Sequence, residues 1–517
     1  MSSRTTNSLK NVSAGILVQL IQMGLGFVSR TVFIWYLSAE YLGVSSLFSS
    51  ILTMLSLTEL GISSAFFFEL YKPLAEKNEA QIAIIIRYFR KAYHWIGFLV
   101  FGVGLILLPF LHQIIAEPPK TIVEDIRIIY LFYLFESASS YFFSYKISLL
   151  SVDQKNYVIT RYQIQFYIVA TLLQILILVL TQNFLFYLSI QIGRQFFSNW
   201  YISRVVDKHY PYLRKFDNKK INPETRINIF INAKASFFTK IGGVLVNSTD
   251  NIFISAFVGL TLLGKYSNYV MLLGIVGSLL SLVFNNIQAS IANFVVTESL
   301  ERKREMFKIL NFMNFLGFGI VSLGFYFCAN DFIRIWVGGN YLISNYVVFA
   351  MIVNFFMMGM QNAFWIYKSA HGLFRYGQYI VLFTGLINIV LSYWLGTEYG
   401  IFGILIATAI ARLVTNFWYD PFIVLKLGLK ENPLHYALRF AKYVSILLGL
   451  GFLFHYLFGF LQLTAWLQIV VMVLTILTIS CLLIFILFRK SEEFKGMLNL
   501  LQKVLQQIGL IKKTVNG

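Results

Sequence analysis

The sequence predicts an all-α polytopic membrane protein with about fourteen transmembrane helices: two six-helix bundles in parallel repeat, followed by two C-terminal helices. Three observations lead to this prediction. Of the 517 residues, 58% are hydrophobic and 13% are charged. Apolar runs long enough to cross a bilayer recur along the whole chain. Several short motifs also return at a nearly constant spacing of about 220 residues.

The individual spans follow from the roughly 20 apolar residues that a helix needs to cross a bilayer. Several runs are longer than this, which indicates tilted helices or helices that continue past the membrane. The first run is expected to remain as a helix, because no small-residue cleavage site follows it. The predicted spans are residues 13–37, 43–68, 93–115, 126–150, 158–180, 184–205, 229–258, 262–296, 309–329, 343–368, 376–396, 399–426, 437–460 and 464–488.

The basic residues predict the orientation of these spans. They gather in alternate loops, and the opposite set of loops holds only Lys120, Arg127, Lys265 and Arg334. Because membrane proteins retain Lys and Arg in cytoplasmic loops, both termini are expected in the cytoplasm and the number of spans is even. The same bias accounts for 42 Lys and Arg against 23 Asp and Glu. Since the basic residues are dispersed over many loops, we expect no nucleic-acid partner.

An internal repeat relates the two halves of the chain. An offset near 220 residues contains six spans, so both copies have the same orientation and are related by an axis along the membrane normal. The matching motifs are Arg30-Thr-Val-Phe-Ile with Asp250-Asn-Ile-Phe-Ile, Leu42-Gly43 with Leu263-Gly264, Tyr145-Lys146 with Tyr367-Lys368, and Arg194, Trp200 and Tyr201 with Arg412, Trp418 and Tyr419.

The repeat and the loop charges predict the domain organisation. Residues 1–206 form the N-terminal bundle, 207–228 a proline-containing cytoplasmic linker, and 229–428 the C-terminal bundle. Residues 429–490 supply two additional transmembrane helices. Residues 491–517 are a cytoplasmic tail with apolar residues at helical spacing, typical of a helix that lies at the membrane interface. The alternative is an extension that packs on the protein itself.

Charged residues inside the spans are the candidate site residues. A charge near the bilayer centre costs at least about 2.5–3.5 kcal/mol, so it faces a partner or a wet cavity. The candidates are Arg30, Glu59, Arg194, Lys240, Asp250 and Arg412, with Glu136 as a further buried acid. Lys240 and Asp250 are ten residues apart, roughly 80° around a helix, so both can face one cavity. The alternative for every candidate is an interhelical salt bridge or a side chain that reaches the interface.

For Arg30, Lys240 and Asp250 a role in the cavity is the favoured interpretation. Spans 13–37 and 229–258 open the two halves, and transporter sites form between halves near the bilayer midplane. For Arg194 and Arg412 the structural and functional interpretations stand equal. Cationic side chains in a wet cavity suit a diphosphate, which arginine grips through paired hydrogen bonds.

Signatures of soluble enzymes are missing, so we expect no enzyme activity, no catalytic residues and no cofactor. The sequence contains no HExxH motif and no CxxC pair, and Cys328 and Cys481 indicate neither a disulfide framework nor a metal site. Residues Gly259 to Tyr266 approach a phosphate-binding loop, but Tyr266 stands where Ser or Thr would bind magnesium. The six histidines are best interpreted as packing residues near span ends.

The motifs around the candidate charges resemble those of a known family. The stretch from Asn11 to Lys72 is similar to the N-terminal signature of bacterial polysaccharide flippases, in particular at Arg30, Leu42-Gly43 and Leu57 through Ala65. Ser236 through Asp250 and Gly264-Lys-Tyr-Ser267 are similar to the matching part of the second half. These flippases form the Wzx-like branch of the multidrug/oligosaccharidyl-lipid/polysaccharide exporter superfamily.

The resemblance implies two six-helix bundles around a V-shaped cavity that opens alternately to each side of the bacterial cytoplasmic membrane. The expected substrate is undecaprenyl diphosphate carrying a short oligosaccharide, flipped to the outer leaflet for capsule, exopolysaccharide or a related surface glycan. Arg30 and Lys240, with Arg194 and Arg412, would hold the diphosphate and acidic sugars. Asp250 would pair with a cation or couple transport to a proton or sodium gradient. Other glycan-assembly membrane proteins are candidate partners.

Three other functions remain as alternatives. A lipid II-type flippase also has a cationic cavity and two extra helices, but its Arg-Ser-Gly-Asp pattern does not occur near Arg30. A cation-coupled multidrug antiporter would depend on Glu59, Glu136 or Asp250, and the first span carries no acid. A membrane-embedded glycan polymerase or ligase would need a large external loop, and the predicted external loops are short.

Overall fold

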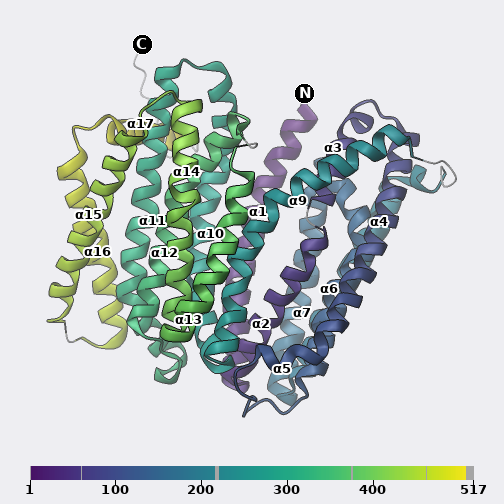
Figure 1. Ribbon diagram of the computed structural model, residues 1–517, viewed down its shortest axis with the longest axis horizontal. Helices are drawn as coiled ribbons and strands as arrows, with labels where there is room; N and C mark the ends of the chain where they lie inside the picture. Colours follow the sequence, from purple (N-terminus) through teal and green to yellow (C-terminus); the bar gives the residue numbers. More distant parts are fainter. Residues whose placement is uncertain (1, 60, 216–220, 374–375, 462, 508–517) are drawn as a thin grey trace. The chain divides into compact units, whose positions relative to one another are not determined.

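A computed structural model describes residues 2–507 except 60, 216–220, 374–375 and 462. The described chain is helical throughout and contains no strand, which confirms the predicted fold class. The main helices (Figure 1) are α1 (Ser2–Tyr36), α2 (Ala39–Leu55), α3 (Ile62–Ala75), α4 (Glu79–Leu107), α5 (Leu111–Ile114), α6 (Ile126–Val152), α7 (Asn156–Thr181), α8 (Phe184–His209), α9 (Pro223–Phe257), α10 (Leu260–Thr297), α11 (Leu300–Val337), α12 (Asn345–Ala370), α13 (Gln378–Val414), α14 (Asn416–Ile423), α15 (Pro433–Phe458), α16 (Ala465–Phe488) and α17 (Glu492–Gln507).

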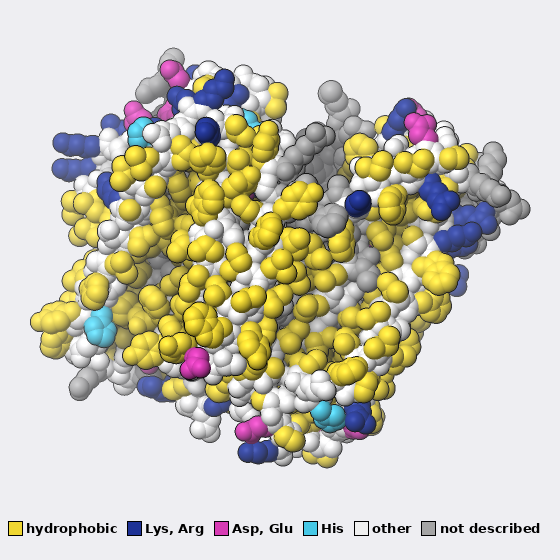
Figure 2. Space-filling view, in the orientation of Figure 1, with side chains coloured by type: hydrophobic (Ala, Val, Ile, Leu, Met, Phe, Trp, Pro, Cys, Tyr) yellow, Lys and Arg dark blue, Asp and Glu magenta, His cyan; other side chains and the backbone are white. Residues whose placement is uncertain are grey.

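The helices are those of a multi-pass membrane protein. Among the described residues, eight helical segments are long and apolar enough to cross a membrane by themselves. Figure 2 shows hydrophobic side chains covering the middle of the helices on the face in view, with Lys and Arg side chains gathered at helix ends. This distribution is the one that a hydrocarbon layer requires, because charged side chains are costly there.

Contacts divide the chain into two compact units. Unit 1 comprises Met1–Ser267 with Val381–Gly400, and unit 2 comprises Asn268–Ile380 with Ile401–Gly517. Helices α10 and α13 therefore contribute to both units, and α9 belongs to unit 1 although the predicted second half begins with it.

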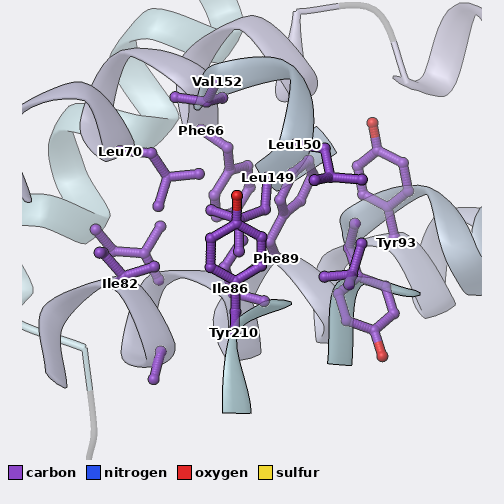
Figure 3. Close-up of a cluster of buried hydrophobic side chains, with 14 of the residues drawn as sticks. Phe66, Leu70, Ile82, Ile86, Phe89, Tyr93, Leu149, Leu150, Val152 and Tyr210 are labelled. Carbon is purple, nitrogen blue, oxygen red and sulfur yellow. The ribbon is translucent and has the colours of Figure 1, made fainter. Parts of the chain in front are cut away.

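The core of unit 1 is aromatic. The rings of Phe66 and Phe89 stack with their centroids 4.1 Å apart, and Tyr93 meets Phe89 edge to face at 4.5 Å. Leu149 and Leu150 of α6 complete the buried cluster shown in Figure 3. Aromatic pairs in these geometries contribute about 0.5–1.5 kcal/mol beyond the area they bury. The cluster therefore holds α3, α4 and α6 together.

One predicted span is broken in the structure. The sequence predicts a continuous helix over 43–68, but α2 ends at Leu55, a 3-10 turn covers Ser56–Glu59, and α3 begins at Ile62. Gly61 has a φ of +91°, in the left-handed region that glycine tolerates best. A Cβ atom at this position would also overlap the carbonyl of Ala233. The break thus lets α9 lie directly against the α2–α3 junction (Figure 1).

A second difference concerns the spans predicted at 376–396 and 399–426. The structure joins most of both into α13, with a kink where Gly400 has a φ of +58°. Helix α14 and a π-helical turn at Val424–Gly428 follow. Gly400 is nevertheless non-helical, so two helical segments meet at this kink, close to the break predicted between residues 396 and 399.

The predicted repeat is visible in the crossing of α2 and α10. A Cβ atom added to Gly43 would overlap the carbonyl of Leu260, and one added to Gly264 would overlap the carbonyl of Ala39. Gly43 thus contacts α10 one turn before Gly264, and Gly264 contacts α2 one turn before Gly43. This reciprocal contact has the symmetry expected of two copies of one repeat.

The repeat also places an equivalent ion pair in each unit. In unit 1, Lys146 Nζ lies 2.8 Å from Asp207 Oδ1. In unit 2, Lys368 Nζ lies 2.5 Å from Asp420 Oδ1. The side chain of Asp207 is 13% exposed, and that of Asp420 is 3% exposed. Removing one partner of a buried pair leaves the other charge without compensation, and the cost rises with burial.

Replacing Asp420 with alanine is therefore expected to destabilise the protein by about 3–5 kcal/mol. Asp207→Ala is the matched variant and should cost less, because the pair in unit 1 retains more contact with solvent. Thermal unfolding of the two purified variants measures the difference. Equal losses of stability would show that burial does not distinguish the two pairs.

Hydrogen bonds join the first turn of α2 to the loop that precedes α6. The carboxylate of Glu40 accepts hydrogen bonds from the backbone N–H and the hydroxyl of Thr121, at 2.8 and 2.7 Å. It also accepts one from Thr261 at 3.3 Å. Burial alone would raise the pKa of Glu40, but these hydrogen bonds outweigh it and hold the pKa below its ordinary value of 4.5. Glu40 precedes the predicted span at 43–68.

This arrangement predicts a pH-dependent stability. Because the pKa of Glu40 is lower in the folded than in the unfolded protein, its contribution is complete above about pH 4.5 and is lost as the pH falls through the lowered value. Unfolding temperatures of the wild type and Glu40→Gln should differ most near neutral pH and converge in acid. A difference that stayed constant down to pH 3 would contradict this assignment.

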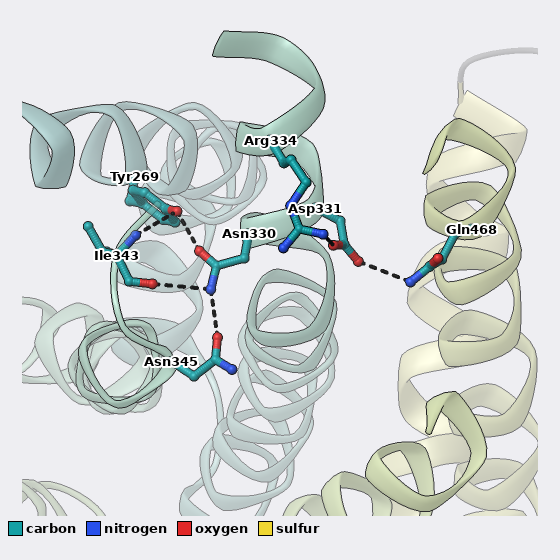
Figure 4. Close-up of polar contacts among 7 residues, drawn as sticks. All are labelled: Tyr269, Asn330, Asp331, Arg334, Ile343, Asn345 and Gln468. Atoms are coloured by element: carbon teal, nitrogen blue, oxygen red, sulfur yellow. Dashed lines mark hydrogen bonds and ion pairs between the residues drawn. The ribbon is translucent and has the colours of Figure 1, made fainter. Parts of the chain in front are cut away.

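A network of polar side chains joins several helices of unit 2 (Figure 4). The hydroxyl of Tyr269 on α10 donates to Asn330 on α11 and accepts the backbone N–H of Ile343 at 3.3 Å. Asn330 donates to the side chain of Asn345 at 2.6 Å. Gln468 on α16 donates to Asp331 at 3.3 Å. The network therefore links α10, α11, α12 and α16.

The tail helix α17 packs on unit 2. Phe494 and Met497 lie against the buried cluster formed around Phe312 and Phe315 of α11. Leu498 and Leu501 of the tail remain 47% and 44% exposed, so among the described residues only part of its apolar side packs on the protein. Residues 508–517 lie outside the described chain.

Candidate substrate site

Two clusters of polar side chains lie within the predicted spans of unit 1. The first, which we call the arginine cluster, consists of Arg30, Glu136, Tyr187, Gln191 and Arg194. Its residues come from α1, α6 and α8: α6 packs on α8, α1 and α8 both pack on α7, and Phe33 of α1 meets the ring of Tyr187 edge to face. The second, which we call the junction cluster, lies at the break between α2 and α3.

Arg30 forms one end of the arginine cluster. Its guanidinium donates a hydrogen bond to the hydroxyl of Ser267, near the start of α10. Three residues further along α1, the ring of Phe33 meets that of Tyr187 on α8 edge to face, with centroids 5.3 Å apart. Arg30 is half-buried, and the helix around it is apolar, so this cation is oriented by neighbouring polar groups and helix packing rather than by bulk water.

Arg194 forms the other end. Its guanidinium lies over the ring of Tyr167 on α7, 5.8 Å from the centroid. One turn earlier on α8, Gln191 donates a hydrogen bond of 2.8 Å to the carboxylate of Glu136. The one acid of this cluster is therefore held by an amide one turn from Arg194.

The junction cluster is organised by Glu59 in the 3-10 turn. The hydroxyl of Tyr93 donates to the carboxylate of Glu59 at 2.5 Å, and that of Ser63 donates to it at 3.0 Å. The next residue, Ser64, accepts a hydrogen bond of 2.9 Å from the ammonium group of Lys240 on α9. An acid and a cation thus reach adjacent serines of α3, and Lys240 remains exposed.

Asp250 and Arg412 lie apart from these clusters. Asp250 is ten residues beyond Lys240 on α9, about 15 Å along the helix. The next residue, Asn251, donates a hydrogen bond of 2.9 Å to Ser50 on α2. Arg412 is buried in the last turn of α13, in unit 2. Lys240 and Asp250 therefore lie at different depths of one helix.

Several residues of the two clusters gave no signal in the sequence. Tyr93, Tyr187 and Ser63 are common residues of transmembrane helices, and a hydroxyl in an apolar run does not stand out. Gln191 did offer a signal, since an amide inside span 184–205 is costly to bury without a partner. The junction cluster forms because the helix breaks at Gly61, which lets Glu59 accept hydrogen bonds from Tyr93 and Ser63.

Comparison with solved structures identifies the fold. The chain is similar to the lipid II flippase MurJ in an inward closed conformation, with a TM-score of 0.60 and 17% identity, covering 91% of this chain and 98% of that one. It is also similar to a multidrug resistance MATE family transporter of the MOP superfamily in an inward-facing conformation, with a TM-score of 0.54 and 11% identity over 83% of this chain and 99% of that one.

A MATE transporter of Vibrio cholerae, VcmN, gives a TM-score of 0.51 and 12% identity over 84% of this chain and 98% of that one. No protein-family model and no curated protein sequence matches the chain. The protein thus has the fold shared by flippases and transporters of the MOP superfamily, in which the named structures are a lipid II flippase and multidrug transporters.

Proposed function

We propose that this protein is a flippase that moves undecaprenyl-diphosphate-linked oligosaccharides across the bacterial cytoplasmic membrane, with both termini in the cytoplasm. The observation that carries the proposal is the arginine cluster. Arg30 on α1 donates to Ser267, and Arg194 on α8 lies over the ring of Tyr167 on α7, the helix on which both α1 and α8 pack. Two guanidinium groups can each form paired hydrogen bonds to one phosphate of a diphosphate.

The other charges take defined roles in this proposal. Lys240 adds a third cation, bound through Ser64 and exposed enough to meet a polar ligand. Asp250 couples the cycle to a proton or sodium gradient. Transport follows from alternating access, because loaded and empty states favour different arrangements of the helices.

Two alternatives have specific support. The MurJ structure covers more of this chain than either multidrug transporter does, which favours a lipid-linked substrate and keeps lipid II among the candidates. Glu136, held by Gln191 beside Arg194, is the acid that a cation-coupled antiporter would use. The first helix nevertheless carries an arginine and no acid within its predicted span.

Ligand-induced stabilisation separates these functions. We would measure the unfolding temperature of the purified protein with an undecaprenyl-diphosphate oligosaccharide, with lipid II and with a cationic dye. A ligand at 100 times its Kd adds about 2.7 kcal/mol of stability. We expect the oligosaccharide lipid to stabilise the wild type and to lose most of this effect in Arg30→Ala and Arg194→Ala.

The other outcomes assign the alternatives. Greater stabilisation by lipid II than by the oligosaccharide lipid would indicate a lipid II-type flippase. Stabilisation by the dye alone, abolished by Glu136→Gln, would indicate a multidrug antiporter and would overturn the proposal.

A further inference from the structure

A large cavity in unit 1 lies outside both clusters. It has a volume of about 1090 Å³ and is lined by α3, α4 and the first turns of α9. All of its lining residues belong to unit 1. Ligand cavities in proteins usually hold about 300–1000 Å³, so this one has room for a charged headgroup together with part of an apolar chain.

Four cations line the cavity. Arg87 and Lys91 are one helical turn apart on α4, and Arg226 and Lys234 lie two turns apart on α9. No Asp or Glu is among the lining residues. Like charges one turn apart on a helix repel each other, so an anion bound between them would be attracted by both.

The remainder of the lining is apolar. Ile62 and Phe66 of α3 form part of the wall, and Ile227 and Phe230 of α9 stand on the same side as Arg226 and Lys234. Ile227 is 58% exposed and Phe230 69% exposed, although both line the cavity. These exposed apolar side chains could be covered by the acyl chain of a lipid. A soluble anion such as free diphosphate would leave them in contact with water.

The position of the cations agrees with a lipid of the inner leaflet. Arg87, Lys91 and Arg226 lie in the loop regions that the distribution of basic residues predicts to be cytoplasmic. Basic pockets between membrane helices on that side bind the headgroups of anionic phospholipids. Four cations are more than one phosphate needs, and they match a headgroup with two phosphates.

From this geometry we infer that the α3–α4–α9 cavity binds an anionic phospholipid with two phosphate groups, of the diphosphatidylglycerol type. Arg87 and Arg226 contact the phosphates, Lys91 and Lys234 add charge, and an acyl chain lies along Phe66 and Phe230. This inference does not depend on the proposed function, because the site uses none of the charges assigned to the substrate.

Native mass spectrometry of the full chain in detergent tests the inference. The probes are diphosphatidylglycerol, phosphatidylglycerol, phosphatidylcholine, undecaprenyl diphosphate and inorganic diphosphate. We expect one molecule of diphosphatidylglycerol to be retained at least tenfold more strongly than phosphatidylcholine. Lys91→Gln combined with Lys234→Gln should weaken this retention at least tenfold, because both side chains are exposed and line the cavity.

The control is Lys72→Gln combined with Lys120→Gln. It removes the same charge from unit 1, at side chains that are 84% and 81% exposed and lie outside the cavity lining. Unfolding temperatures without lipid show that both double variants are folded. Retention that is equal in the two double variants, tighter retention of undecaprenyl diphosphate at this site, or saturation by inorganic diphosphate alone would each overturn the inference.

Discussion

Replacing Gly264 with valine is expected to prevent this protein from reaching its folded state in useful amounts. A Cβ atom at Gly264 would overlap the carbonyl of Ala39, which is backbone and has no rotamer to change. The first turns of α2 and α10 would have to separate, and Gly43 against Leu260 would separate with them. Overpacking in a close contact costs about 1–3 kcal/mol, and more where backbone must move.

The measurement is the yield and the unfolding temperature of the monodisperse protein after extraction from membranes. Gly274→Val is the control on the same helix, because a Cβ at Gly274 meets nothing within 4 Å. Valine is no worse than glycine inside a helix, so the control should behave as wild type. Normal yield and stability of Gly264→Val would show that the α2–α10 contact is looser than described.

Replacing Arg30 with alanine is expected to abolish the surface glycan of producing cells while leaving the protein in the membrane. Each hydrogen bond to a charged group contributes about 1.5–3 kcal/mol, which corresponds to a rate roughly 10–150-fold lower if the bond holds the transported diphosphate. Arg30→Lys should retain part of the activity, because an ammonium keeps the charge but not the paired hydrogen bonds.

Arg302→Ala serves as the control for Arg30→Ala. Arg302 lies in the first turn of α11, where its exposed guanidinium pairs with Glu298 at 3.0 Å. It should change neither the amount of glycan nor the amount of protein. Glycan is measured on intact cells and protein in isolated membranes. Normal glycan in Arg30→Ala would remove Arg30 from the substrate site.

The fold was largely predictable because its cause is compositional. A hydrocarbon layer accepts only helices whose side chains are mostly apolar, so each span leaves a run of about 20 apolar residues. The helix break at Gly61 was not predictable in this way. It depends on the backbone of Ala233 in α9, some 170 residues away in the sequence. A hydropathy profile is computed from neighbouring residues and so cannot predict a contact between residues far apart in the sequence.

The candidate site was predictable only through its charges. Arg30 and Arg194 were identified because guanidinium groups are rare in apolar runs, and the structure places them on two helices that both pack on α7. Their grouping was not foreseen, since it depends on how α1, α6 and α8 turn about their axes. Lys240 and Asp250 illustrate the opposite case. Helical spacing placed them on related faces, but Lys240 lies by Ser64 of α3, whereas the residue after Asp250 contacts Ser50 of α2.

Glycan flipping in vesicles tests the central claim most directly. The purified protein would be reconstituted into vesicles that contain a tagged undecaprenyl-diphosphate oligosaccharide, and an impermeant reagent would report how fast the enclosed glycan becomes accessible. The account predicts faster access than in protein-free vesicles, with the acceleration lost in Arg30→Ala. No acceleration with any lipid-linked glycan, under any proton or sodium gradient, would contradict it.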